Sequence, residues 1–125
     1  MATRAERLHA EPNIWLATSR PTGKPHLTPI WFVFVDDAVW VCTGANAVKA
    51  RNMTADPRVS IALEDGNAPV VGEGTAQRVL DVPAAVVVEF QRKHNWDIAT
   101  DDAYQAVFRI EIAKWLHPSN EAEIV

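Results

Sequence analysis

The sequence predicts a small, mainly β protein, built as a six-stranded antiparallel β-barrel. Its 125 residues suit one domain, residues 1–125, and 48% apolar with 22% charged side chains supply a packed core. Six segments rich in strand formers follow one another, and helical patterns occur only at the start, between the third and fourth strands, and before the last strand. Because strands and helices do not alternate, a doubly wound parallel sheet is excluded.

The first elements are a short helix and two strands. Residues 3–11 have the pattern of a capped helix, which Pro12 ends before the first strand at residues 14–18. A stretch dense in turn residues then leads to a long second strand at residues 26–35. From Ile30 onward this strand is apolar on both faces, so it needs two covers.

A tight turn and a third doubly apolar strand follow. The two aspartates at 36–37 predict a hairpin turn, and residues 38–43 predict the third strand. We expect the barrel interior to cover one face of these strands and a partner subunit to cover the other. Residues 47–55 form a short helix, and residues 58–64 alternate between apolar and polar, which is typical of a half-buried antiparallel strand.

The last part of the chain predicts two strands around a longer helix. Residues 70–80 alternate imperfectly and contain two glycines, which suits a bulged strand at a barrel corner. We expect Asp81 to cap a helix from residue 82 to about residue 96. Residues 104–116, with apolar side chains at every second position, give the long sixth strand.

Charge, cysteine content and hydropathy exclude several classes of partner. A net charge of −4 is the wrong sign for coating nucleic acid. The single cysteine, Cys42, permits no internal disulfide, and no Cys/His spacing suggests a metal site. Within its apolar strand, Cys42 is expected to be a buried, inert thiol. Since no segment suits a signal peptide or a membrane span, the sequence predicts a cytoplasmic protein without membrane contact.

The sequence lacks two motifs that are typical of hydrolases. No serine lies in a Gly-x-Ser-x-Gly turn, and no His-Glu-x-x-His occurs. The Gly-Glu-Gly at residues 72–74 lies within a strand pattern rather than before a helix, so both glycines are interpreted as structural.

Two stretches could bind a ligand. In residues 43–52 a strand end, a small-residue turn and two cations, Lys49 and Arg51, lead into a helix start, where free N–H groups and the helix dipole favour an anion. The alternative is a solvated basic helix. In residues 26–31, Pro29 interrupts a strand and predicts a bulge or a sheet edge, whose free backbone groups could bind a planar heterocycle. The alternative there is an ordinary edge strand.

The order of these features resembles a known family. Pro-His-x-x-Pro-x-Trp-Phe at 25–32 precedes the turn at 36–37, a strand ending in threonine, Lys-x-x-Asn at 49–52 and Asp-Pro-Arg-Val at 56–59. This order resembles the pyridoxamine 5′-phosphate oxidase-like split β-barrel superfamily. Within that superfamily it is most similar to the actinobacterial branch of small flavin/deazaflavin oxidoreductases that use coenzyme F420.

The resemblance implies an FMN-binding-protein-like split barrel that forms a homodimer, with cofactor sites at the subunit interface. It places Thr28, Pro29, Ile30 and Trp31 along the isoalloxazine or deazaflavin ring, and Thr43, Lys49, Arg51 and Asn52 near the phosphate. One departure is that Ala47 occupies a position where relatives often have a second basic residue. Arg51 is the candidate substitute.

The implied function is an F420-dependent reductase that transfers hydride to a small organic acceptor. Because the ring carries the redox chemistry, no side chain is assigned a catalytic role. Trp96, Tyr104 and Trp115 are candidates for the acceptor pocket or for core and dimer contacts, and His94 and His117 could meet a substrate. The alternatives are an FMN-dependent oxidase or reductase of the same fold and a non-enzymatic cofactor- or haem-binding protein.

Overall fold

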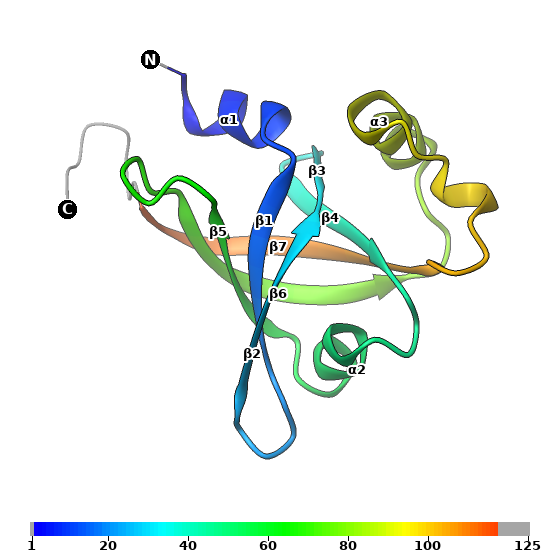
Figure 1. Ribbon diagram of the computed structural model, residues 1–125, viewed down its shortest axis with the longest axis horizontal. Coiled ribbons are helices and arrows are strands. Elements are labelled where there is room, and N and C mark those ends of the chain that lie inside the picture. The colour runs from blue at the N-terminus through cyan, green and yellow to red at the C-terminus, as the bar shows by residue number, and fades with distance from the viewer. Residues whose placement is uncertain (1, 118–125) are drawn as a thin grey trace.

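The computed structural model describes residues 2–117 as one antiparallel sheet that curls on itself, with helices packed against it (Figure 1). The strands of the sheet are β1 (Asn13–Ser19), β2 (Pro25–Trp31), β3 (Val33–Val35), β4 (Ala38–Thr43), β5 (Arg58–Leu63), β6 (Val71–Val79) and β7 (Ala106–His117). The helices are α1 (Arg4–Ala10), α2 (Val48–Ala55), α3 (Ala84–His94) and the short 3-10 helix η1 (Ile98–Thr100). No helix within residues 2–117 is both long and apolar enough to cross a membrane.

The strand order shows how the sheet closes. It runs β2-β1-β5-β6-β7-β4-β3, so β2 and β3 lie at opposite edges. Only Phe32 separates these two strands in the chain, which means that the two edges of the curled sheet meet at this residue. The predicted mainly β antiparallel barrel is therefore confirmed.

The strand count differs from the prediction, with seven strands in the described residues in place of six. The segment at residues 26–35, expected to be one long strand, is divided at Phe32. Residues before Phe32 pair with β1, and residues after it pair with β4. A continuous apolar run carries no sign of this change of partner, because both halves are strand-forming and both are largely enclosed.

Local signals place most element ends correctly. Thr3 and Glu6 form the reciprocal capping box of α1. Asp36 and Asp37 both adopt positive φ, as a two-residue hairpin between β3 and β4 requires. The predicted bulge in β6 is confirmed by register shifts between β6 and β7 at Val71/Gly72 and Glu73/Gly74.

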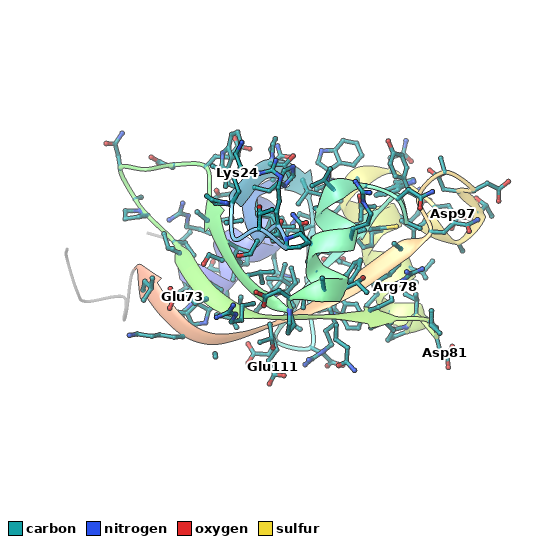
Figure 2. All side chains as sticks on the ribbon, turned by 90° about the horizontal axis from the view of Figure 1, so that it is seen from below. Lys24, Glu73, Arg78, Asp81, Asp97 and Glu111 are labelled. Atoms are coloured by element: carbon teal, nitrogen blue, oxygen red, sulfur yellow. The ribbon has the colours of Figure 1, made fainter. Side chains whose placement is uncertain are left out.

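The start of α3 differs from the prediction. Asp81 was expected to cap this helix, but the helix begins at Ala84 after Pro83, which makes no side-chain capping hydrogen bond. Asp81 instead lies near the end of β6 and points outward (Figure 2). Pro83 delays the helix start because the residue before a proline, here Val82, is disfavoured in the α region.

Two apolar cores hold the helices against the sheet. The first fills the barrel, where α1 and α2 add Leu8 and Met53 to the strand side chains. The second lies between α3, η1 and the outer face of β3, β4 and β7, where Phe90 and Ile98 pack with Trp40. The second cover of β4 is thus α3 of the same chain, and not the partner subunit expected from the apolar pattern.

Candidate functional site

A cleft of about 460 Å³ lies where β2, the end of β4, the start of α2 and the segment after α3 meet. Its walls are Pro29, Ile30, Trp31, Cys42, Thr43, Lys49, His94, Asn95, Trp96, Asp101 and Tyr104. The cleft therefore joins both stretches that the sequence marked as ligand-binding candidates.

One wall of the cleft is an open strand edge. β2 is the outermost strand of the sheet and pairs only with β1, which confirms the edge predicted from Pro29. In an antiparallel edge strand, every second residue directs its N–H and C=O groups away from the partner strand. Pro29 has no N–H group, so it can offer this edge only its carbonyl oxygen as an acceptor, beside the apolar side chains that line the cleft.

An aromatic cluster begins at Trp31, the last residue of β2, and continues into the segment after α3. The Trp31 ring stacks on the His94 ring with centroids 4.7 Å apart and an interplanar angle of 15°, and Trp96 meets Trp31 edge-on at 6.1 Å. Tyr104 in turn contacts Trp96 at 5.7 Å. The indole N–H of Trp96 donates to Asp101 Oδ2 at 2.9 Å, which fixes the orientation of this ring.

His94 anchors the aromatic cluster to the sheet. Its Nε2 donates to the carbonyl oxygen of Phe32 at 2.8 Å, so the break between β2 and β3 gains the hydrogen bond that neither strand supplies there. Burial lowers the pKa of His94, although the bond to Phe32 opposes that shift. His94 is accordingly neutral near pH 7, and Nδ1 keeps its lone pair.

The polar end of the cleft lies at the start of α2. Thr43 ends β4, and Lys49 lies in the first turn of the helix. The residue that caps this helix, Ala47, offers no side-chain hydrogen bond, so the first N–H groups of α2 have no side-chain acceptor. A cationic side chain beside free helix N–H groups is suited to an anion such as a phosphate.

Five of the eight predicted cofactor-binding residues line this cleft, namely Pro29, Ile30, Trp31, Thr43 and Lys49. Thr28 is half-buried outside the lining, with its hydroxyl 3.4 Å from the carbonyl oxygen of Pro29. Arg51 is exposed on α2. Asn52 is buried and donates from Nδ2 to Thr18 Oγ1 at 3.0 Å, so it fastens α2 to β1 and does not face the cleft.

The other sequence candidates divide between the cleft and the core. Trp96, Tyr104 and His94 belong to the lining. Trp115 packs against the barrel core, with the Arg4 guanidinium 4.6 Å above its ring. The side chain of His117 lies outside the described part of the chain.

Two lining residues had not been singled out. Asn95 follows α3 in the left-handed conformation, with φ of 50°, and Asp101 holds Trp96. An asparagine directly after a helical pattern is a known helix-ending signal and could have located the first. No comparable signal marks Asp101, because its role depends on a ring placed by the fold.

Cys42 is the lining residue for which the sequence predicted an inert thiol. Its Sγ donates to the carbonyl oxygen of Tyr104 at 3.3 Å, and burial raises the pKa of the thiol to about 12. At pH 8 we expect the folded protein to react with a thiol-alkylating reagent about a thousandfold more slowly than the urea-unfolded chain, because so little thiolate is present. Comparable rates in the two states would contradict this expectation.

A second hollow, of about 560 Å³, lies on the sheet formed by β1, β5, β6 and β7. Its charged side chains are Arg58, Glu73 and Lys114, and it contains none of the predicted site residues. No group of three or more metal-ligating side chains occurs in the described residues. The first cleft is therefore the candidate site.

Comparisons with known proteins identify a matching family and solved structures that share this fold. A family model described as pyridoxamine 5′-phosphate oxidase matches residues 2–117. A conserved hypothetical protein from Mycobacterium tuberculosis is 29% identical, with a TM-score of 0.74 over 92% of this chain and 83% of that one. None of the curated proteins matches the chain.

Two further solved structures share the fold at lower identity. An F420 reductase is 20% identical, with a TM-score of 0.70 over 86% of this chain and 91% of that one. The haem storage protein from Vibrio cholerae is 19% identical, with a TM-score of 0.68 over 83% of each chain. At these identities the likeness shows the fold alone.

Proposed function

This chain belongs to the pyridoxamine 5′-phosphate oxidase family, and on that premise we propose that it is an F420-dependent reductase. The observation that carries the proposal is the cleft that joins the flat edge of β2 to Lys49 at the start of α2. Further support comes from the motif order between residues 25 and 59, which is similar to the F420-dependent branch, and from the shared fold of an F420 reductase.

The residues present fit a deazaflavin with a phosphate-bearing tail. Pro29 and Ile30 line the cleft with apolar side chains at the free edge of β2, which suits a flat heterocycle that also hydrogen-bonds to the main chain. Lys49 and the uncapped start of α2 offer a cation and N–H donors for the phosphate.

When bound, F420 supplies a hydride carrier at its ring. The protein would contribute binding, orientation and exclusion of water. Trp31 and Trp96 would shape the space for a planar acceptor, since their rings are held by His94 and Asp101 respectively. No side chain is assigned the proton that completes reduction of the acceptor, and solvent can supply it.

A side-by-side titration of the purified apoprotein with F420 and FMN, followed by ligand fluorescence, tests the proposal. Tight binding of F420 with weak binding of FMN is the expected result. Preference for FMN would assign the protein to the oxidase or reductase alternative on the same barrel. Binding of neither, followed by tight binding of haem, would favour the non-enzymatic alternative.

We also propose that two copies of the chain associate through the outer face of β1 and β2. Side chains at every second position of these strands face outward, and three of them are large and exposed, namely Trp15 (40%), Leu27 (64%) and Trp31 (46%). Register places Trp15 opposite Pro29, so the apolar face is continuous with the cleft wall. A second copy on this face would bury it and narrow the mouth of the cleft.

We expect Leu27→Lys to convert the dimer into a monomer at micromolar concentration, as measured by sedimentation. The lysine would place a charge in an apolar interface, once from each copy, where its desolvation is unfavourable. Leu80→Lys is the matched control, because Leu80 is even more exposed (86%) but directly follows β6, away from β1 and β2. A monomeric unmodified protein would contradict the proposed dimer.

A further inference from the structure

His94 is the imidazole that lines the cleft, and the proposed function gives it no chemical role. It is the last residue of α3, and its ring stacks on Trp31 with centroids 4.7 Å apart. Phe90, which belongs to the second core, lies 5.9 Å from the same ring. With Nε2 bonded to the carbonyl oxygen of Phe32 at 2.8 Å, the position of the imidazole is fixed.

The hydrogen bond to Phe32 decides which nitrogen of His94 a ligand can meet. A carbonyl oxygen only accepts, so Nε2 carries the hydrogen and Nδ1 has the lone pair of the neutral ring. Nδ1 makes no hydrogen bond within the described residues, and, unlike Nδ1 of His26, it keeps contact with solvent. The cleft is therefore lined by an imidazole with one anchored nitrogen and one that a ligand can reach.

The surroundings of His94 accommodate both the neutral and the protonated ring. Burial lowers its pKa, whereas the carbonyl oxygen of Phe32 raises it. The stacked indole of Trp31 also favours a cation. Protonation adds a hydrogen at Nδ1 and leaves the bond from Nε2 to Phe32 intact, so the ring can change its charge without moving.

The charged groups around His94 come from three elements. On α3, its own helix, those that act on its pKa are, in order of effect, Lys93, Glu89 and Arg92. From the other elements of the cleft, Lys49 on α2 and Asp101 after η1 bring one charge of each sign, and the lining residues of β2 bring none. Among these groups, the imidazole is the one whose ordinary pKa lies nearest neutrality.

The place of His94 suits contact with an acceptor. The proposed cofactor ring lies along Pro29 and Ile30, and Trp31, with His94 stacked on it, follows directly on β2. A planar acceptor between the cofactor ring and the aromatic cluster would lie beside His94 Nδ1. Reduction of that acceptor requires a proton as well as a hydride.

We propose that His94 is a catalytic residue, whose Nδ1 takes up a proton from solvent and passes it to the acceptor as the hydride arrives there. The inference rests on the proposed function for the source of the hydride. In a planar conjugated carbonyl compound, the hydride forms the new bond, and the displaced π-electron pair moves onto an oxygen. The bond between Nδ1 and its hydrogen then breaks, the oxygen gains the proton, and His94 returns to its neutral form.

Binding of a charged acceptor mimic tests the proposal without turnover. Lawsone, a hydroxynaphthoquinone, is a planar anion at neutral pH, whereas menadione is a neutral compound with the same ring system. Imidazole C–H resonances of the full chain are followed by NMR from about pH 5 to pH 8, with each compound, in the absence and in the presence of F420. His94→Gln assigns the resonance, since its side-chain amide can still donate to Phe32.

We expect lawsone to raise the pKa of His94 by about one unit or more, and menadione to leave it almost unchanged. The reason is that only the anion accepts a charge-assisted hydrogen bond from a protonated Nδ1. Because this measurement uses the unmodified protein, it decides the matter even if His94→Gln folds poorly.

The pH profile of menadione reduction by reduced F420 is the second readout. We expect kcat/KM of the unmodified protein to fall about tenfold per pH unit above the pKa that NMR gives for His94 in the F420-loaded protein. His94→Gln should lose this dependence and about a hundredfold in kcat at low pH, while its Kd for F420 changes less than about twofold. His9→Gln is the matched control and should follow the unmodified protein, because His9 is exposed on α1.

The remaining outcomes separate this inference from the proposed function. If F420 binds and His94→Gln keeps the rate and the pH profile of the unmodified protein, the proton comes from elsewhere, and only the proposed function stands. If F420 does not bind but lawsone raises the pKa of His94, the proton-donating role stands and the proposed cofactor is wrong. If lawsone leaves the pKa unchanged both with and without F420, the inference is overturned.

Discussion

Gly74→Ala is expected to destabilise the fold by about 3 kcal/mol, measured as the free energy of unfolding in urea. Gly74 lies in β6 at one of the two register shifts against β7. A Cβ at this position would overlap the carbonyl oxygen of Glu111 and would lie 3.0 Å from Ile112 Cα. Because these are backbone atoms of the paired strand, relief requires the two strands to separate, which breaks ladder hydrogen bonds.

Alanine variants of two other glycines serve as controls for Gly74→Ala. Gly66→Ala should leave stability almost unchanged, because a Cβ there would have no atom within 4 Å. Gly72→Ala should have an intermediate effect, since its Cβ would lie 2.9 Å from Ile112 Cγ2 and 3.0 Å from the Trp115 ring, both of them side-chain atoms. Equal stability of the Gly74 and Gly66 variants would show that β6 and β7 can move apart without cost.

Prediction of the fold succeeded where the signal is local. Pro29 indicated a bulge or a sheet edge because it cannot donate to a ladder, and β2 is an edge strand. The paired aspartates at 36 and 37 indicated a turn, and both have the positive φ that the turn requires. The break at Phe32 escaped prediction because what distinguishes β2 from β3 is the strand each one pairs with, which is a property of the closed sheet.

The apolar pattern of β4 did not reveal what covers its second face, because that also depends on the folded arrangement. A strand that is buried on both faces needs two covers, but hydrophobicity alone does not identify the second one. Here the second cover is α3, through Val86 and Phe90. The exposed apolar side chains that suggest a partner belong instead to β1 and β2.

The candidate site, like the fold, was only partly predictable from the sequence. Residues that approach the cleft along one strand, from Pro29 to Trp31, could be identified from consecutive positions. On α2, consecutive positions diverge by about 100° around the helix axis. Lys49 therefore faces the cleft, whereas Arg51, two residues further and about 200° around the axis, is exposed. Asn52, almost one turn beyond Lys49, is buried and donates to Thr18. The other members of the aromatic cluster that begins at Trp31, namely His94, Trp96 and Tyr104, come from a segment far along the chain, which only the fold brings into place.

Lys49→Ala is expected to weaken F420 binding by about 1 to 3 kcal/mol, or roughly fivefold to 150-fold in Kd. The reason is the loss of a charge-assisted contact to the phosphate at the start of α2, where backbone N–H groups remain but no full charge replaces the ammonium. Fluorescence titration of F420 at constant ionic strength measures the change. Because Lys49 makes none of the hydrogen bonds that hold α2 to β1, the variant should fold normally.

Two matched variants test whether the loss of F420 affinity depends on where the positive charge is removed. Lys24→Ala removes the same charge in the β1–β2 turn, outside the cleft, and should change Kd less than twofold (Figure 2). Arg51→Ala tests whether the exposed guanidinium on α2 takes the place of the basic residue that Ala47 lacks. An effect of Arg51→Ala equal to that of Lys49→Ala would mean that the arginine turns toward the phosphate on binding. An unchanged Kd for Lys49→Ala would remove the phosphate from the start of α2, and with it the strongest support for a cofactor lying along β2.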